Sequence, residues 1–202
     1  MHKIGVLASG RGSNLQAILD NIADGNLLVE VAVVISDKPD AMALSRAKEY
    51  GIPAVTVDRK GCADKAEFEA RIDASLREYD VELVVLAGFM RILSSWFVKR
   101  WPLKLINIHP ALLPSFTGLD AQGQAVAYGV KVSGCTVHFV DEGTDTGPII
   151  LQKVVPVEDT DNGDTLAARI LIQEHRALPE ALKLWSEGRL HVQGRKVSIE
   201  KK

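Results

Sequence analysis

Short apolar runs rich in Val and Ile alternate along this chain with segments whose apolar residues recur every three or four positions. The apolar runs occupy residues 3–8, 29–36, 54–58, 81–87 and 105–109. Such runs are typical of strands buried on both faces, and parallel strands need a crossover, usually a helix, between them. The alternation therefore predicts an α/β fold: a Rossmann-like, open, mostly parallel twisted sheet with helices on both faces.

Three helices between these strands are predicted from apolar spacing and end signals. The first has its apolar stripe over residues 15–22, with Ser13 as its candidate cap. The second is expected at residues 42–50, where a glycine and then a proline follow. The third begins after Asp64, and Glu67 stands three residues on as a capping-box partner.

The pattern changes after Pro110, where Gly, Pro and Ser punctuate a loop that runs to Gly118. The elements expected beyond it are a helix at 121–128, strands at 135–140 and 149–157, a helix at 164–185, and a short terminal strand with a solvated tail. No repeat or linker interrupts the sequence, so a single domain is predicted over residues 1–202.

Composition and charge limit what the chain can bind. Its 202 residues include 24 Lys and Arg against 26 Asp and Glu, a net charge of −2, whereas a general nucleic-acid binder carries a basic surplus. The apolar runs fall short of the ~20 residues that span a bilayer, and the first is too brief for a signal peptide. Cys62 and Cys135 stand in no metal-binding spacing, so unpaired buried thiols are expected. These features predict a cytoplasmic protein that acts on small molecules.

The first candidate site lies where a strand gives way to a helix, at Ser9-Gly10-Arg11-Gly12-Ser13-Asn14. Glycines let the backbone approach an anion, and the amide groups and positive dipole end of a helix attract it, so a phosphate site is expected. A tight turn without a ligand is one alternative. A dinucleotide site is the other, because Asp37 follows at a tolerable spacing; however, Leu15 stands where the fingerprint G-x-G-x-x-G has its third glycine.

The second candidate site is Asn107-Ile108-His109-Pro110, at the end of the fifth expected strand. Side chains two positions apart on a strand share a face, so Asn107 and His109 should point together. An amide donor beside a titratable ring suits the stabilisation of a developing oxyanion. The alternative is a strand-end histidine with a purely structural hydrogen bond.

Carboxylates supply two further candidates. The loop of residues 141–148 holds three of them, and its length and glycines would let it fold back over a site. A carboxylate brought close to His109 would favour the imidazolium; otherwise the loop is solvated surface. Glu174 falls on the apolar stripe of the last helix, where a charge must be paired or must face a ligand, unless it lies at the edge of the stripe.

The first two candidates, with Gly88-Phe89-Met90, lie at the carboxyl ends of expected parallel strands, where open α/β sheets bind ligands. The longer runs around them are SGRGSNLQ at 9–16, LAGFMRIL at 86–93, INIHPALLP at 106–114, HFV at 138–140 and DTGPIILQ at 145–152. These runs, in this order along the chain, resemble those of the phosphoribosylglycinamide formyltransferases, a folate-dependent family of purine biosynthesis. The resemblance extends from about residue 1 to residue 190.

The resemblance implies a role for each matching residue. Asn107, His109 and Asp145 look like catalytic residues. The ribonucleotide would be held by Gly12, Ser13 and Asn14 at its phosphate and by Glu174 at its ribose or glycinamide group. The folate pocket would comprise Met90, Arg91, Ile92, Leu93, Val140, Asp141, Glu142, Gly143 and Thr144. Asp120 and Gly123 stand where some members carry His and Arg, which leaves the role of the 118–124 loop open.

The resemblance also divides the domain into a nucleotide- and phosphate-binding half (1–110), a folate-binding and catalytic half (111–190) and a C-terminal tail (191–202). The implied reaction moves a formyl group from 10-formyltetrahydrofolate, as co-substrate, to the amine of glycinamide ribonucleotide. It would involve no metal, nucleic acid or membrane, and the enzyme would be a monomer or homodimer.

Related and unrelated classes can be weighed against this interpretation. A methionyl-tRNA formyltransferase should add a basic C-terminal domain, and a formyltetrahydrofolate hydrolase an N-terminal regulatory domain; 202 residues with a strand beginning at residue 3 leave room for neither. A nicotinamide-dependent oxidoreductase is disfavoured by Leu15. A non-catalytic nucleotide-binding module would not need Asn107, His109 and Asp145 together.

Overall fold

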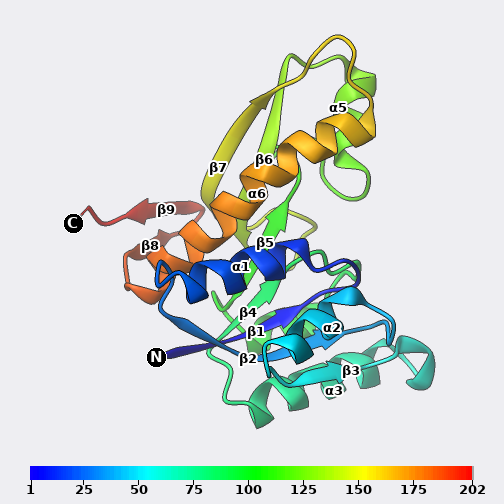
Figure 1. Cartoon of the computed structure of the whole chain (residues 1–202), viewed down its shortest axis with the longest axis vertical. Coiled ribbons are helices and arrows are strands. Elements are labelled where there is room, and N and C mark those ends of the chain that lie inside the picture. Colours follow the sequence, from blue (N-terminus) through cyan, green and yellow to red (C-terminus); the bar gives the residue numbers. More distant parts are fainter. Residues whose placement is uncertain (202) are drawn as a thin grey trace. The chain divides into compact units, whose positions relative to one another are not determined.

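A computed structural model describes residues 1–201 and shows two compact units, Met1–Ile106 and Asn107 to the C-terminal end (Figure 1). The division falls inside one strand, β5 (Leu105–His109), whose first two residues belong to the first unit and whose last three belong to the second. The functional assignment of halves at 1–110 and 111–190 stays a prediction.

The first unit is built on parallel strands. β1 (His2–Leu7), β2 (Val29–Ser36), β3 (Ala54–Thr56) and β4 (Leu83–Leu86) follow the order β3-β2-β1-β4, with the start of β5 next to β4. The pairs β1–β2, β1–β4 and β2–β3 are all parallel. The connecting elements are α1 (Ser13–Ala23), α2 (Met42–Glu49), α3 (Lys65–Glu78), α4 (Ser95–Arg100) and a short 3-10 helix at Arg59–Gly61.

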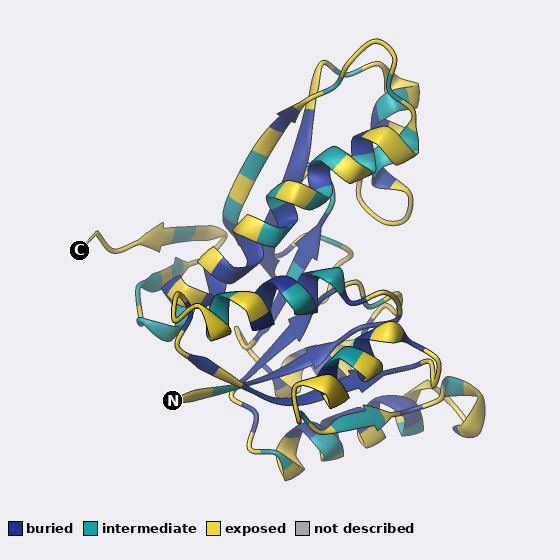
Figure 2. Cartoon of the chain, in the orientation of Figure 1, coloured by how far each residue is buried: buried dark blue, intermediate teal, exposed yellow. Residues whose placement is uncertain are grey.

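Apolar side chains from strands and helices form the core of this unit, and Figure 2 draws most of its strand residues in the buried colour. Ile4 of β1, Leu83 of β4, and Leu15 and Ile18 of α1 are all fully buried, and each such side chain contributes about 1.5–3 kcal/mol of hydrophobic free energy. Ile22, the last residue of the predicted stripe, is only half-buried. The buried face of α1 therefore ends one turn earlier than predicted.

The two predicted helix caps differ from the structure in detail. Ser13 is not a cap, because α1 begins at Ser13 and its N-cap is Gly12, which makes no side-chain capping bond. Gly12 has φ +69°, a left-handed conformation that glycine adopts without the steric cost of a Cβ. For α3, Asp64 accepts from the N–H of Glu67 at 2.8 Å, as predicted. The Glu67 carboxylate, however, accepts from the N–H of Ala63 at 2.6 Å, one residue before the expected partner.

Helix α4 was not predicted. It spans only six residues, too short for an apolar period to be visible. Ser94 caps it by accepting from the N–H of Phe97 at 3.3 Å, and the buried Glu69 of α3 accepts from the N–H of Ser94 at 2.7 Å and from its hydroxyl. The start of α4 thus depends on a carboxylate 25 residues earlier in the chain.

The second unit continues from β5 with a mixed arrangement of strands. Its order is β5-β6-β7-β9-β8, in which β6 (Val132–Phe139) and β7 (Ile149–Pro156) pair antiparallel. α5 (Ala121–Tyr128) has the predicted bounds. α6 (Gly163–Ser186) packs on β6 and β7 and buries Ile170, Leu178 and Leu182, as its apolar stripe predicted.

The C-terminal segment is more ordered than the predicted single strand and tail. β8 (Leu190–Gln193) and β9 (Lys196–Ile199) form an antiparallel hairpin around Gly194, which has φ +61°. β9 also pairs in parallel with β7, at Ile149 and Lys196. Among residues 1–201, no helix is both long and apolar enough to cross a membrane.

Candidate active site

The end of β5 places two of the predicted residues side by side. Ile106 and Ile108 are buried, and Asn107 and His109 alternate with them along the strand, so they share the other face. The Asn107 amide nitrogen Nδ2 lies 3.1 Å from Nε2 of His138, at the end of β6. The structure thus joins the ends of two strands through an amide and an imidazole.

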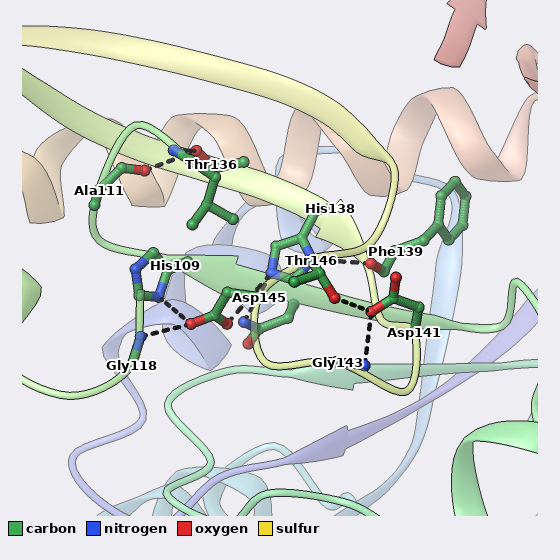
Figure 3. Close-up of polar contacts among 12 residues, drawn as sticks. His109, Ala111, Gly118, Thr136, His138, Phe139, Asp141, Gly143, Asp145 and Thr146 are labelled. Carbon is green, nitrogen blue, oxygen red and sulfur yellow. Dashed lines mark hydrogen bonds and ion pairs between the residues drawn. The ribbon is translucent and has the colours of Figure 1, made fainter. Parts of the chain in front are cut away.

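His109 is buried, and Figure 3 shows one of its ring nitrogens facing the Asp145 carboxylate. Nε2 donates to the backbone oxygen of Phe116 at 2.8 Å, and Nδ1 lies 3.4 Å from Oδ2 of Asp145. Both ring nitrogens thus face an acceptor, one a backbone carbonyl and the other a carboxylate. This geometry brings together the imidazole and the acid that the sequence analysis paired.

Asp145 is held from several directions. Its Oδ2 accepts from the N–H of Gly118 at 2.9 Å, and its Oδ1 lies 3.8 Å from Nε2 of His138. The side chain is 14% exposed, so its charge is only partly screened by water. Its backbone has φ +55°, a left-handed conformation that is uncommon outside glycine and usually reflects a constraint from the surroundings.

His138 was missed as a functional residue by reasoning from the sequence. It is buried, and Nδ1 donates to the backbone oxygen of Phe139 at 2.8 Å. Burial lowers the pKa of His138 below its ordinary value, although the Phe139 carbonyl and the charge of Asp145 act against this. The ring is therefore neutral near pH 7, with the proton on Nδ1 and an acceptor at Nε2 for the Asn107 amide. A second strand-end histidine directly before an acidic loop was the available signal.

We call Asn107, His109, His138 and Asp145 the His109 cluster. All four belong to the second unit. The cluster brings an amide, two imidazole rings and a carboxylate into one set of contacts, and one of the rings, His138, is neutral. Such a set can stabilise an oxyanion and move a proton.

The loop after β6 carries the remaining second-unit predictions. Val140 and Asp141 are half-buried, while Glu142, Gly143 and Thr144 are exposed. Asp141 does not extend outward, because its Oδ1 accepts from the N–H of Gly143 at 3.1 Å and from the Thr146 hydroxyl at 2.6 Å. The assignment of this loop to a folate pocket stays a prediction.

Glu174 is buried on α6, as its position on the apolar stripe predicted. Burial raises the pKa of the Cys135 thiol on β6 to about 12, and the nearby charge of Glu174 adds to this shift. Both cysteines are free and buried, as predicted. The role of Glu174 toward a ribonucleotide stays a prediction.

The predicted phosphate loop lies in the first unit, between β1 and α1. Gly12 comes so close to α2 that a Cβ on it would lie 2.8 Å from the Cα of Ala43. The N–H of Ala43 donates to Gly10 at 3.1 Å, and the N–H of Ser9 donates to Gly88 at 3.0 Å. The backbone at the start of α1 is therefore fixed by contacts with α2 and with the segment after β4, which suits a helix end that binds an anion.

The segment of residues 90–93 follows β4 in the same unit. Met90 and Ile92 are 60% and 70% exposed, whereas Leu93 is buried. The N–H of Met90 donates to Ser9 Oγ at 2.9 Å, and Arg91 Nε lies 2.7 Å from Oδ2 of the buried Asp37. This ion pair uses Oδ2 of Asp37, whereas its Oδ1 is buried without a hydrogen-bond partner among residues 1–201.

No cluster suited to a metal was found in the described part of the chain, residues 1–201, where no group of three or more His, Cys, Asp or Glu residues is placed to hold an ion.

Comparison with known proteins identifies relatives over most of the chain. The family model described as "Formyl transferase" matches residues 2–182. A phosphoribosylglycinamide formyltransferase of Bacillus subtilis is 44% identical over 91% of this chain and 94% of its own length. The human trifunctional purine biosynthetic protein adenosine-3 is 46% identical over 92% of this chain. The chain spans only 18% of that longer relative.

Solved structures agree with these relatives. Glycinamide ribonucleotide transformylase 1 from Symbiobacterium toebii has a TM-score of 0.97 and 50% identity, and the match covers all of this chain and 95% of that one. A formyltetrahydrofolate deformylase from Pseudomonas syringae has a TM-score of 0.92 and 30% identity, covering 99% of this chain and 66% of that one. These matches confirm the predicted α/β fold class.

Proposed function

We propose, because the chain belongs to the formyl transferase family, that it transfers the formyl group of 10-formyltetrahydrofolate to the amine of glycinamide ribonucleotide. The products are formylglycinamide ribonucleotide and tetrahydrofolate, in de novo purine biosynthesis. Similarity to the Bacillus subtilis enzyme over nearly the full length of both chains supports the choice of substrate. The observation that carries the chemistry is the His109 cluster, in which Asp145 Oδ2 lies 3.4 Å from His109 Nδ1.

The substrate amine is the nucleophile in this proposal. The chain's own thiols are poorly suited to the role, since Cys62 and Cys135 are buried and the pKa of Cys135 is raised to about 12, which leaves almost no thiolate at neutral pH. The neutral amine attacks the formyl carbon directly. A bond forms between the amine nitrogen and that carbon, and the carbonyl oxygen becomes an oxyanion.

Asn107 and His109 stabilise this oxyanion. Asn107 donates one Nδ2 hydrogen to His138 and has a second for the substrate. The Nε2–H of His109 is donated to the Phe116 carbonyl in this structure, so the formyl oxygen takes the place of that carbonyl when substrate binds. One well-placed donor of this kind is worth about 3 kcal/mol of barrier.

Asp145 has two tasks. Its carboxylate next to Nδ1 stabilises the cationic ring of His109. Through a water molecule it also takes a proton from the attacking amine and returns one to N10 of the folate as the bond from N10 to the formyl carbon breaks. The proton count then balances, because the amine loses the proton that the departing N10 gains.

The binding roles come from the resemblance and extend the proposal. Gly12, Ser13 and Asn14 bind the phosphate, Glu174 contacts the ribose or glycinamide group, and residues 90–93 and 140–144 receive the folate. The exposed apolar side chains of Met90 and Ile92 suit the face of a pterin ring. No step calls for a metal or nicotinamide. We propose a cytoplasmic enzyme, a monomer or homodimer, without nucleic-acid or membrane partners.

A product assay tests this proposal. The purified protein is mixed with 10-formyltetrahydrofolate and glycinamide ribonucleotide, and the deformylated folate is followed by absorbance. We expect turnover that requires both substrates. Loss of formyl groups at the same rate without the ribonucleotide would instead indicate hydrolysis, the reaction suggested by the likeness to a formyltetrahydrofolate deformylase. Absence of turnover with both substrates would overturn the proposal.

A further inference from the structure

The Asp141 carboxylate points back into its own loop, as Figure 3 shows. Its Oδ1 accepts from the N–H of Gly143 at 3.1 Å and from the Thr146 hydroxyl at 2.6 Å. Hydrogen bonds to an ionised acceptor are stronger than those between neutral groups. The Oδ1 atom of Asp141 therefore stabilises the conformation of the loop.

Asp145, the proposed proton carrier, follows inside this loop in a conformation that needs support. Its φ of +55° lies in the left-handed region, which Asp enters where its short side chain is hydrogen-bonded locally. Thr146, its direct neighbour, is tied to Asp141, and Gly147 is packed so closely on the Phe139 carbonyl that a Cβ there would overlap that oxygen. The backbone on the C-terminal side of Asp145 is thus fixed at two consecutive residues.

Gly143 leaves space for the hydrogen bond between the Asp141 carboxylate and the Thr146 hydroxyl. A Cβ on Gly143 would overlap the Thr146 hydroxyl oxygen, so the glycine leaves room for that hydroxyl to reach Asp141. The loop therefore contains an acceptor at 141, a residue without a Cβ at 143 and a donor at 146.

We propose that Asp141 is a positioning residue that acts through Thr146 to hold Asp145 in the left-handed conformation directing its carboxylate toward Nδ1 of His109. This inference rests on the proposed function, because its effect is read in formyl transfer. It revises the expectation that the Asp141 carboxylate serves the folate. The Asp141–Thr146 bond sets the rate of the chemical step and leaves substrate affinity almost unchanged.

The cleanest variant is Thr146→Val, which removes the hydroxyl, keeps the size of the side chain and leaves the charge of Asp141 in place. That charge should be kept because it also acts on His138. Thr146→Ser restores the donor and is the rescue variant. Thr160→Val is the matched control, since Thr160 is exposed in a turn that follows β7, whereas the 141–148 loop precedes that strand.

We expect Thr146→Val to lower kcat by about ten- to a hundredfold, the range that follows from losing a hydrogen bond to a charged acceptor and misplacing a reacting group. KM for both substrates should stay within about twofold of wild type, because ground-state binding is unaffected. Thr146→Ser should recover most of the lost kcat, and Thr160→Val should match wild type. Asp141→Asn, which keeps an acceptor oxygen, should fall between wild type and Thr146→Val.

A second measurement needs no turnover. The ring nitrogen chemical shifts of His109, recorded by NMR without substrates, should move in Thr146→Val and stay unchanged in Thr160→Val. Unchanged kcat and unchanged His109 shifts in a folded Thr146→Val protein would overturn the positioning role, as would a rise in KM for the folate at constant kcat. An inactive wild-type protein whose His109 shifts still respond to Thr146→Val would instead count against the proposed function alone.

Discussion

The loop after β1 and the loop after β6 differ in the contacts that hold them and in the chemistry that they offer. Residues 9–14, in the first unit, are held by backbone hydrogen bonds and by the close approach of Gly12 to Ala43. Residues 140–148, in the second unit, combine the close approach of Gly147 to Phe139 with side-chain bonds from Asp141 to Gly143 and Thr146. Backbone amides suit an anion of fixed charge, whereas proton transfer needs groups that titrate. The proposed function makes residues 9–14 the binding loop and residues 140–148 the chemical loop.

The largest effect is expected where the chemical loop carries the proton. Asp145→Asn keeps the side chain's shape and an acceptor for the N–H of Gly118, but it removes the charge beside His109. kcat should fall by about 10²–10⁴-fold, the usual contribution of a general acid–base group, while KM for the ribonucleotide changes little. Steady-state kinetics measure both, and a kcat close to wild type would remove Asp145 from the mechanism.

A substitution in the binding loop should change KM for the ribonucleotide more than kcat, the reverse of the effect expected for Asp145→Asn. Gly12→Ala adds a Cβ at a left-handed position, 2.8 Å from the Cα of Ala43, and should cost about 1–3 kcal/mol of unfolding free energy. KM for the ribonucleotide should rise more than kcat falls. For stability, Gly10→Ala is the control, since nothing lies within 4 Å of its Cβ position. Equal losses of stability in the two variants by urea unfolding would contradict the close approach.

A smaller effect concerns pH and stability. Burial lowers the pKa of His138 in the folded protein below the 6.5 of an ordinary histidine. In the interval between the folded and unfolded pKa values the unfolded chain binds more protons, so the unfolding free energy falls as the pH drops below about 6.5. This loss has a limit of about 1.4 kcal/mol per pH unit for one group.

His138→Gln should reduce that slope, and His191→Gln, which alters an exposed side chain, should not. Urea unfolding at pH 7.5, 6.5 and 5.5 measures both slopes. A slope that is the same in wild type and His138→Gln would show that other groups cause the acid dependence.

The smallest expected effect concerns how readily a thiol reagent labels Cys135. Since burial raises the pKa of Cys135 to about 12, a thiol reagent at pH 8 should label it only after unfolding. Mass spectrometry of the native and the urea-unfolded protein would show this difference, and rapid labelling of Cys135 in the native protein would contradict its buried position.

Elements with a strong local pattern could be predicted from the sequence. The strand at residues 105–109 and the helix at 121–128 were predicted with the bounds they have in the structure. Asn107 and His109 could be paired because strand alternation puts them on one face. Asp145 was connected to them by the resemblance, and the structure brings its carboxylate within 3.4 Å of His109.

Features that depend on distant residues could not be predicted in this way. The start of α4 relies on Glu69 of α3, and the β8–β9 hairpin pairs with β7 through Ile149 and Lys196. The partners of His109 and Asn107 were also missed, because a backbone oxygen at Phe116 and a ring at His138 meet them only through tertiary structure. Local periodicity contains none of these contacts.

The central claim is that His109 and Asp145 act as one unit on one formyl carbon. A double-mutant cycle tests it most directly, with kcat measured for His109→Asn, Asp145→Asn and the double variant. Residues that act together give non-additive losses, so the double variant should retain a kcat within about threefold of the slower single variant. Losses that multiply in the double variant would show two independent groups and contradict the account.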